Sequence, residues 1–260
     1  MNIIVLVKQV PNTTEMKVDK EKGTLIREGV DTIINPDDLA SIECALAIKD
    51  LIPETFIRVI TMGPLQAKRM LVDCYGYGVD DCVLLCDRAF AGSDTWATST
   101  ILSQAIKRYD YDLILAGKQA IDGDTAQVGP QVAAHLNIPQ VTCVKTIDAV
   151  KPSTIELTKD YDTYEETLRV NTPCLLTIQA ESTTVRKANF RDVWFADTKE
   201  ITVLDNATLA CDVENIGLKG SLTQVKKTFV RPVDMKGEMI EGNIELAAQR
   251  LAQLIVKASS

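Results

Sequence analysis

Segments with the patterns of β-strands and α-helices alternate through residues 1–145, and this alternation restricts the fold more than any other feature of the sequence. Short apolar runs suited to single strands occur at residues 3–9, 55–62, 82–86, 113–116 and 140–145. Helical spacing of apolar residues lies between these runs, at residues 36–52, 65–75, 93–109 and 126–136. Because strands that alternate with helices form a parallel sheet covered on both faces, the pattern predicts an α/β fold with a doubly wound, mostly parallel sheet.

The expected order of these five strands is 3-2-1-4-5, which reverses direction between the first and the fourth strand. Ligands of such sheets bind outside the carboxyl ends of the strands at this reversal. The order brings together Lys8, Asn35, Gly63 and the loop that begins at Gly117. Four loops that are far apart in the sequence therefore converge on one predicted site.

Residues 113–135, LILAGKQAIDGDTAQVGPQVAAH, have the order of a buried strand, a polar loop and a helix. The free N–H groups at the start of such a helix, together with its dipole, favour an anion such as a phosphate group. Asp124 or Thr125 is the expected N-cap. The loop matches neither G-x-x-x-x-G-K-[ST] nor G-x-G-x-x-G, so an ordinary strand-to-helix turn is the alternative.

After residue 151 the pattern changes, and the chain continues with strands of alternating polarity. Residues 154–158 and 163–170 are typical of an antiparallel hairpin, and residues 174–179 form another short apolar run. We expect these strands to extend the sheet with antiparallel edge strands. Earlier in the chain, residues 17–26 indicate a second, small hairpin.

Residues 181–200 combine aromatic and basic side chains on a predicted loop. Phe190, Trp194 and Phe195 lie there among Arg186 and Arg191. Aromatic residues and arginine are enriched at protein interfaces. The alternative is a loop that packs its aromatic side chains, Trp194 above all, into its own domain.

The last part of the chain differs in composition from the first. We expect a nucleotide-binding domain at residues 1–204, and an extended polar arm at residues 205–260 with little that could form a core. The arm closes with an amphipathic helix at residues 243–256. A long polar segment that ends in such a helix is typical of an arm that wraps around a partner.

Composition excludes several classes of function. The net charge of −8 argues against nucleic acid as the main partner. No run approaches the roughly 18 apolar residues of a membrane span, and the beginning of the chain has no signal-peptide pattern. The seven scattered cysteines indicate reduced thiols in the cytoplasm. With a single histidine and no CxxC motif, the Cys82–Cys86 pair does not predict a metal site.

The motif GKQAIDGDTAQVG at residues 117–129 resembles that of the beta subunit of electron transfer flavoproteins. The opening VLVKQVP at residues 5–11 and the turns Asn35-Pro36 and Met62-Gly63-Pro64 fall where that family has them. The resemblance covers essentially the whole chain. It implies a heterodimer with an alpha subunit that holds the electron-carrying FAD, and an adenine nucleotide bound by the beta subunit itself.

In simple members of that family the beta-subunit nucleotide is a structural AMP. In electron-bifurcating members it is a second FAD, which accepts a hydride from NADH and divides the electron pair. One electron goes towards ferredoxin or flavodoxin, and the other passes through the alpha-subunit FAD to a dehydrogenase. The sequence resembles the bifurcating group, which implies FAD, with AMP as the alternative. No residue is expected to act as acid, base or nucleophile, because the cofactor carries the redox chemistry.

The resemblance and the crevice together predict a set of cofactor-binding residues. They are Leu6, Val7, Lys8, Asn35, Met62, Gly63, Gly117, Lys118, Gln119, Ala120, Ile121, Asp122, Gly123, Asp124, Thr125, Ala126, Gln127 and Val128. Residues 117–128 are expected to hold the phosphates, while Asn35 and residues 6–8 border the adenosine and residues 62–63 form the opposite wall. Lys8 or Lys118 would favour an anionic reduced flavin if it lay near the ring; either is otherwise a solvated lysine.

The family also has a loop that docks on an acyl-CoA-type dehydrogenase through one apolar anchor. By resemblance this loop is residues 181–200, the anchor is Phe190 where others commonly carry leucine, and Arg191 lies beside it. Whether the partner acts on an acyl-CoA, an enoyl-CoA or a 2-hydroxy acid stays open.

Two other functions fit the predicted architecture less well. An adenylating or pyrophosphatase-type enzyme would normally have a glycine-rich loop after the first strand, and residues 8–11, KQVP, contain no glycine. A small nucleotide-binding stress module would not explain the long segment after residue 150.

Overall fold

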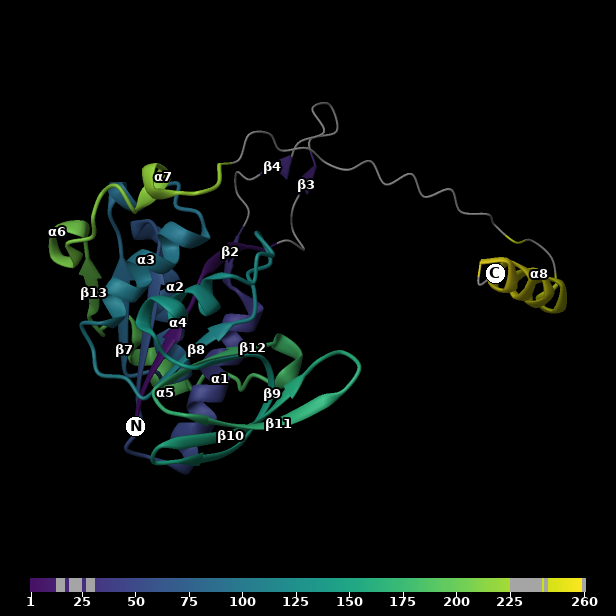
Figure 1. Ribbon diagram of the computed structural model, residues 1–260, viewed down its shortest axis with the longest axis horizontal. Coiled ribbons are helices and arrows are strands. Elements are labelled where there is room, and N and C mark those ends of the chain that lie inside the picture. Colours follow the sequence, from purple (N-terminus) through teal and green to yellow (C-terminus); the bar gives the residue numbers. More distant parts are fainter. Residues whose placement is uncertain (13–16, 19–24, 27–30, 225–239, 241–242, 259–260) are drawn as a thin grey trace.

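The computed structural model describes residues 1–12, 17–18, 25–26, 31–224, 240 and 243–258 (Figure 1). Its centre is a nine-stranded sheet of order β11-β10-β9-β12-β8-β1-β6-β7-β13. The strands are β1 (Asn2–Leu6), β6 (Phe56–Met62), β7 (Asp81–Leu85), β8 (Leu113–Gly117), β9 (Gln140–Lys151), β10 (Thr154–Asp160), β11 (Glu165–Asn171), β12 (Cys174–Ile178) and β13 (Ile201–Leu204). Strands β13 to β9 run parallel, and β10 and β11 add an antiparallel edge.

The remaining elements cover this sheet or connect its strands. The α-helices are α1 (Pro36–Leu51), α2 (Lys68–Tyr77), α3 (Thr95–Ile106), α4 (Val128–Leu136), α5 (Phe190–Ala196), α6 (Asn206–Leu209), α7 (Gly217–Gly220) and α8 (Ile244–Ala258). The 3-10 helices are η2 (Leu65–Ala67), η3 (Arg88–Phe90) and η4 (Ala180–Ser182). The short strands β2 (Gln9–Pro11) and β5 (Thr32–Ile34) pair with each other, as do β3 (Lys17–Val18) and β4 (Leu25–Ile26). The β3–β4 pairing confirms the small hairpin, whose turn lies outside the described residues.

Alternate residues of the central strands face two separate apolar cores. Ile3 and Val5 of β1 belong to the core under α1 and α2, whereas Ile4 and Leu6 belong to the core under α3 and α4. Because both faces of these strands are covered by helices, nearly every residue of β1 is buried. The predicted doubly wound α/β fold with antiparallel edge strands is confirmed.

The expected strand order is right for the first four strands and wrong for the fifth. Strand β12 pairs with β8, and β9 pairs with the far side of β12. Composition gives the reason: all five residues of β12 are buried, whereas β9 carries exposed polar residues along its length. A strand buried on both faces must be largely apolar, so Cys174–Ile178, whose one polar residue is Thr177, takes the inner position.

Two segments after residue 180 also differ from the expectation. Part of the predicted loop at 181–200 is the helix α5, whose N-cap Asn189 accepts a hydrogen bond from the Arg191 N–H (2.9 Å). Beyond Leu204, the side chains of Leu209, Cys211 and Ile216 are buried in the core beside α3. The expectation of little core after residue 205 is therefore wrong for this stretch, and the division of the chain at residue 204 stays a prediction.

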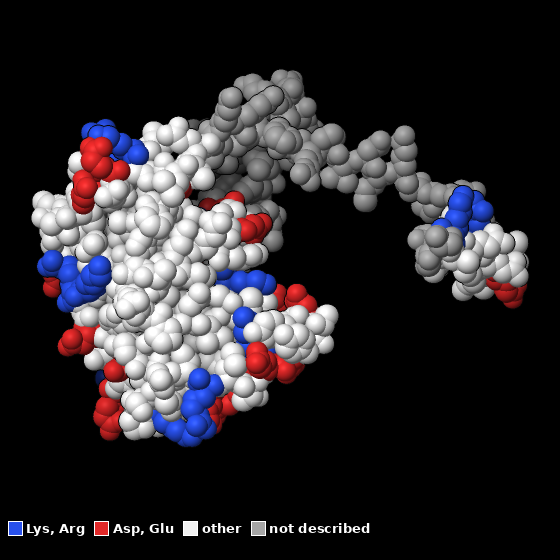
Figure 2. Space-filling model, in the orientation of Figure 1, with Lys and Arg blue, Asp and Glu red and all other residues white. Residues whose placement is uncertain are grey.

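The closing helix α8 begins at Ile244, close to the predicted position, and in Figure 1 it lies apart from the sheet. Its apolar side chains are exposed, among them Ile244, Leu251, Ile255 and Val256. On the face shown in Figure 2, the described acidic and basic side chains form small separate groups. Among the described residues no helix combines the length and apolar character needed to cross a membrane.

Candidate functional site

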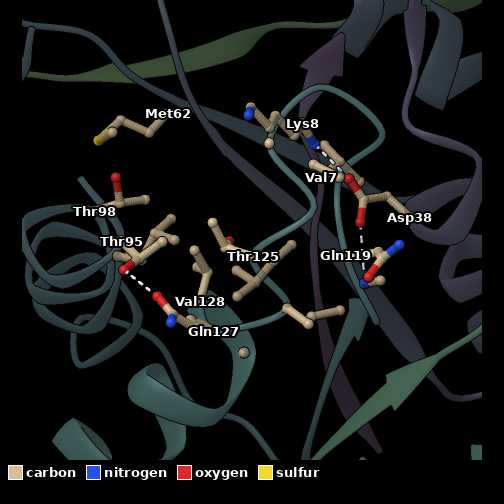
Figure 3. Close-up of a pocket in the computed structure, with 18 of the residues that line it drawn as sticks. Val7, Lys8, Asp38, Met62, Thr95, Thr98, Gln119, Thr125, Gln127 and Val128 are labelled. Atoms are coloured by element: carbon tan, nitrogen blue, oxygen red, sulfur yellow. Dashed lines mark hydrogen bonds between the residues drawn. The ribbon is translucent and has the colours of Figure 1, made fainter. Parts of the chain in front are cut away.

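A cavity of about 560 Å³ lies at the carboxyl ends of β1, β6 and β8, next to the beginnings of α3 and α4. Strand β1 pairs with both β6 and β8, so the cavity marks the reversal of the strand order. In Figure 3, Lys8, Val7 and Asp38 lie on one side, and Thr95, Thr98 and Gln127 on the other. This is the place where open α/β sheets bind ligands.

Most of the predicted cofactor-binding residues line this cavity. They are Leu6, Val7, Lys8, Met62, Gly117, Lys118, Gln119, Ala120, Gly123, Thr125, Ala126, Gln127 and Val128. Asn35, Gly63, Ile121, Asp122 and Asp124 are not among the lining residues of this cavity, whose walls consist of described residues only. The loops predicted to converge do lie together, although not every member faces the cavity.

The loop between β8 and α4 has an unusual backbone. Asp124 and Ala126 adopt positive φ angles of 48° and 53°. The helix therefore begins at Val128 rather than 126, and its N-cap is Gln127 instead of Asp124 or Thr125. Successive N–H groups around a left-handed residue form a concave, anion-binding surface.

The first turn of α4 leaves N–H groups available to a ligand. Val128 and Gly129 have no carbonyl partner within the helix, because the first N–H groups of any helix lack one. The Gln127 side chain does not cap the helix; it accepts a hydrogen bond from the Thr95 hydroxyl (2.8 Å, Figure 3). The N–H groups and the helix dipole thus remain directed at the cavity edge, as a phosphate site requires.

Asn35 lies behind the loop. It is fully buried; its amide group donates to the Gln119 carbonyl (2.8 Å) and accepts from the Ile121 N–H (3.1 Å). Both polar atoms of the side chain are therefore engaged with the loop. The predicted position of Asn35 beside the adenosine stays a prediction.

Asp38 is the acidic side chain buried at the cavity wall. Its two oxygens accept hydrogen bonds from the N–H groups of Lys8 (2.8 Å) and Gly117 (3.0 Å). Burial raises the pKa of the Asp38 carboxyl to about 7, against the lowering effect of the polar groups bonded to it. Burial also raises the pKa of the neighbouring Asp37.

Lys8 and Lys118 are the basic residues among those that line the cavity. The Lys8 Nζ lies 2.7 Å from the carboxylate of Asp122, and both side chains are partly exposed. Lys8 is therefore neither isolated nor a freely solvated lysine. The ion pair joins the end of β1 to the loop at residues 117–127 across the opening.

The family description "Electron transfer flavoprotein domain" matches residues 22–209. The chain belongs to the electron transfer flavoprotein family. It is 46% identical over 248 residues to the electron transfer flavoprotein subunit beta of Clostridium acetobutylicum, covering 95% of both chains. It is 45% identical to the caffeyl-CoA reductase-Etf complex subunit CarD of Acetobacterium woodii (98% of each chain), and 39% identical to protein FixA of Azotobacter vinelandii (99% and 95%). These relatives place the chain among the beta subunits of the family.

Sequence reasoning missed the wall of this cavity that α3 and the residues just before it provide. Ser93, Asp94, Thr95 and Thr98 line the cavity, and Ile60 and Leu102 add apolar surface. The Asp94 carboxylate caps α3 by accepting from the Ala97 N–H (3.0 Å). A signal was present, because the run Ser93-Asp94-Thr95 follows a buried strand and has the composition of a helix N-cap.

A second exposed feature lies on α5, far from the cavity in the sequence. Phe190 is 79% exposed and Trp194 is 69% exposed, and their ring centroids are 5.9 Å apart. The alternative in which Trp194 packs into its own domain is therefore wrong. We name Phe190, Trp194 and Phe195 the aromatic ridge; all three are large, exposed apolar side chains on one short helix.

The segment that carries the aromatic ridge is fixed to the domain at several points. Arg186 forms ion pairs with Glu43 (2.9 Å) and Asp50 (2.8 Å) of α1, which raise the pKa of its guanidinium. Val193 packs against α2 so closely that a Cβ on Gly76 would lie 3.1 Å from its Cγ2. The contacts with α1 and α2 thus hold the aromatic ridge in place on the surface of the domain.

Proposed function

We propose that this chain is the beta subunit of a heterodimeric electron transfer flavoprotein, and that its cavity binds FAD. The observation that carries the proposal is the cavity at the strand reversal, bordered by the unpaired first N–H groups of α4, in a chain of this family. The residues fit such a group, because the phosphates find N–H donors and the rings find apolar walls at Leu6, Ile60 and Leu102.

The roles of the chain's own residues are binding and orientation. Residues 125–129 hold the phosphates through N–H groups, with the Thr125 hydroxyl available to the same ligand, whereas the N–H groups of Gly123 and Asp124 already donate to the Ala120 carbonyl. Met62 and Leu102 exclude water from the apolar side. When bound, FAD supplies the redox chemistry: it accepts a hydride from NADH and passes the two electrons on singly. No side chain of the site needs to transfer a proton for this purpose.

The names of two related proteins support the partners that we propose. CarD belongs to a caffeyl-CoA reductase-Etf complex, and another relative, 43% identical, is the acryloyl-CoA reductase electron transfer subunit gamma of Anaerotignum propionicum. We propose an alpha subunit as the partner of the closing arm, with α8 as its docking helix. A CoA-type flavin dehydrogenase binds the aromatic ridge, and ferredoxin or flavodoxin accepts the second electron.

The alternative is a structural AMP in the same cavity, in a chain that only relays electrons between a dehydrogenase and an acceptor. AMP and FAD both contain an adenosine and a phosphate group, and in either ligand the phosphate would accept hydrogen bonds from the same N–H groups of α4. Walls made of apolar side chains from β1, β6 and α3 favour FAD, because AMP has no second ring system to cover them.

One experiment distinguishes the two. The full chain is co-expressed with its alpha subunit, and the purified heterodimer is denatured to extract and quantify its nucleotides. Two FAD per heterodimer, with reduction of the visible flavin spectrum by NADH, is the expected result. One FAD and one AMP would reject the bifurcating function and leave the electron-relay function.

A further inference from the structure

The first turn of α1 directs three polar side chains away from its own backbone and towards the loop at residues 117–121. Asn35 is the N-cap of this helix, yet within the described part of the chain it makes no side-chain capping bond. Asp37 and Asp38 follow in the first turn, where the helix dipole stabilises negative charge. We name Asn35, Asp37 and Asp38 the clamp.

Each member of the clamp accepts hydrogen bonds from the backbone of another segment. Asp38 bonds the N–H of Gly117, and Asp37 bonds that of Gln119 (3.1 Å). Asn35 bonds the N–H of Ile121 as well as the carbonyl of Gln119. Every second N–H of the loop, at residues 117, 119 and 121, is thus held by α1.

The same carboxylates join the loop to two neighbouring segments. The second oxygen of Asp38 accepts from the Lys8 N–H at the end of β1. The second oxygen of Asp37 accepts from the Ala180 N–H in η4 (2.8 Å). The clamp therefore connects the segments that follow β1, β8 and β12, which are neighbours in the sheet.

The loop approaches the clamp so closely that position 117 has no room for a side chain. A Cβ on Gly117 would lie 2.2 Å from Asp38 Oδ1 and 2.7 Å from Asp37 Cβ. Gly123, at the far end of the loop, has nothing within 4 Å of a Cβ. The clamp therefore restricts the beginning of the loop, at residues 117–121, most closely.

We propose that Asn35, Asp37 and Asp38 are positioning residues, which hold residues 117–121 in the conformation that binds the nucleotide. This rests on the proposed function, because it concerns the affinity of the same cavity. Ordering a loop on binding costs conformational entropy, and a loop held in advance avoids that cost.

Substitution of Asp37 tests the proposal in the heterodimer of full-length chains. Asp37→Ala removes the hydrogen-bond acceptor of two backbone amides. The Gln119 amide lies in the loop after β8, and the Ala180 amide lies in η4. We expect faster hydrogen exchange at both amides in the nucleotide-depleted protein, and about tenfold weaker binding of added FAD or AMP. Asp37→Asn keeps one acceptor oxygen, so it should restore the protection of one amide and part of the affinity.

The matched control is Asp73→Asn, which removes the charge of a carboxylate on α2 that lies 3.9 Å from Arg69 Nε. It should change neither amide exchange nor nucleotide affinity. Faster exchange with unchanged affinity would make the clamp merely structural, and weaker binding with unchanged exchange would make Asp37 a direct ligand contact; either result overturns the proposal.

The nucleotide content of the unsubstituted heterodimer distinguishes failure of the proposed function from failure of the positioning proposal. An unsubstituted heterodimer whose beta subunit retains neither FAD nor AMP would reject the nucleotide site, and the positioning proposal with it. A normal nucleotide content, combined with unchanged exchange in Asp37→Ala, would overturn the positioning proposal alone.

Discussion

The two regions that we propose as binding sites, the cradle at residues 117–129 and the aromatic ridge on α5, present different kinds of groups to a ligand. The cradle presents backbone N–H groups, and the side chains that fix it come from α1 behind it. The ridge presents exposed side chains on a helix that α2 supports. A substitution within the ridge should remove the contact itself. In the cradle, the damaging substitutions are those that disturb its support.

The strongest test of this difference is Gly117→Ala. The new methyl group would collide with Asp38 and Asp37 at the distances given above, and neither can move without losing its hydrogen bonds. We expect a loss of about 1–3 kcal/mol in the free energy of unfolding and the loss of most bound nucleotide. Urea unfolding and nucleotide extraction measure the two effects.

The control for this substitution lies in the same loop. Gly123→Ala adds the same methyl group at a residue without a positive φ angle and with no atom of the described residues, apart from its chain neighbours, within 4 Å of that group, so the free energy of unfolding should stay unchanged. The control concerns stability alone, because Gly123 lines the cavity. Equal effects of the two substitutions would show that the clamp does not restrict the loop.

The ridge should respond in the opposite way. Phe190→Ala removes an exposed anchor, and we expect roughly 30-fold slower electron transfer to the partner dehydrogenase, as for a hot-spot residue, with unchanged nucleotide content. Stopped-flow measurement of flavin reduction by the dehydrogenase provides the rate.

The control is Leu51→Ala, which removes another exposed apolar side chain (80%) at the end of α1. It should leave the rate unchanged. A normal rate in Phe190→Ala would remove this residue from the docking surface, and loss of nucleotide would show that the ridge and the cradle are not independent.

The pH dependence of stability sharpens the comparison, because the cradle has a buried carboxyl behind it. Burial raises the folded-state pKa of Asp38 from 3.8 to about 7, so the folded protein binds a proton that the unfolded chain has lost. This contribution to stability is complete below pH 4 and is lost as pH rises through about 7. The expected slope approaches 1.4 kcal/mol per pH unit at most.

Asp38→Asn cannot ionise and should flatten the slope between pH 4 and 7. Urea unfolding at several pH values gives the difference between the two proteins, from which contributions of other groups cancel. Parallel curves for the two proteins would show that the Asp38 carboxyl has an ordinary pKa.

The smallest effect is expected for Lys8, whose side chain forms an ion pair with Asp122 of the cradle. Lys8→Met breaks the partly exposed ion pair with Asp122, and such pairs contribute about 1 kcal/mol or less. Nucleotide content should persist, because the backbone supplies the phosphate contacts. Urea unfolding and nucleotide extraction check both points, and release of the nucleotide would make Lys8 a direct ligand.

The sequence alone determined the layers of the fold and the place of the site. Alternating apolar residues in β1 and helical spacing in residues 36–52 need no knowledge of distant contacts, because each pattern is local. The motif at residues 117–129 identified the loop for the same reason. The aromatic and basic composition of residues 181–200 predicted an exposed surface, although it did not predict the helix α5.

Only the tertiary structure decided which segments meet. Strand β12 enters between β8 and β9 because a largely apolar strand is more stable in the interior, a choice that depends on all competing strands at once. The side chain of Asn35 and the carboxylates of Asp37 and Asp38 look like ordinary helix-start residues in the sequence. Apart from Lys8, their partners are 79 to 143 residues away along the chain, and only the packing of α1 against the sheet brings them within hydrogen-bond distance.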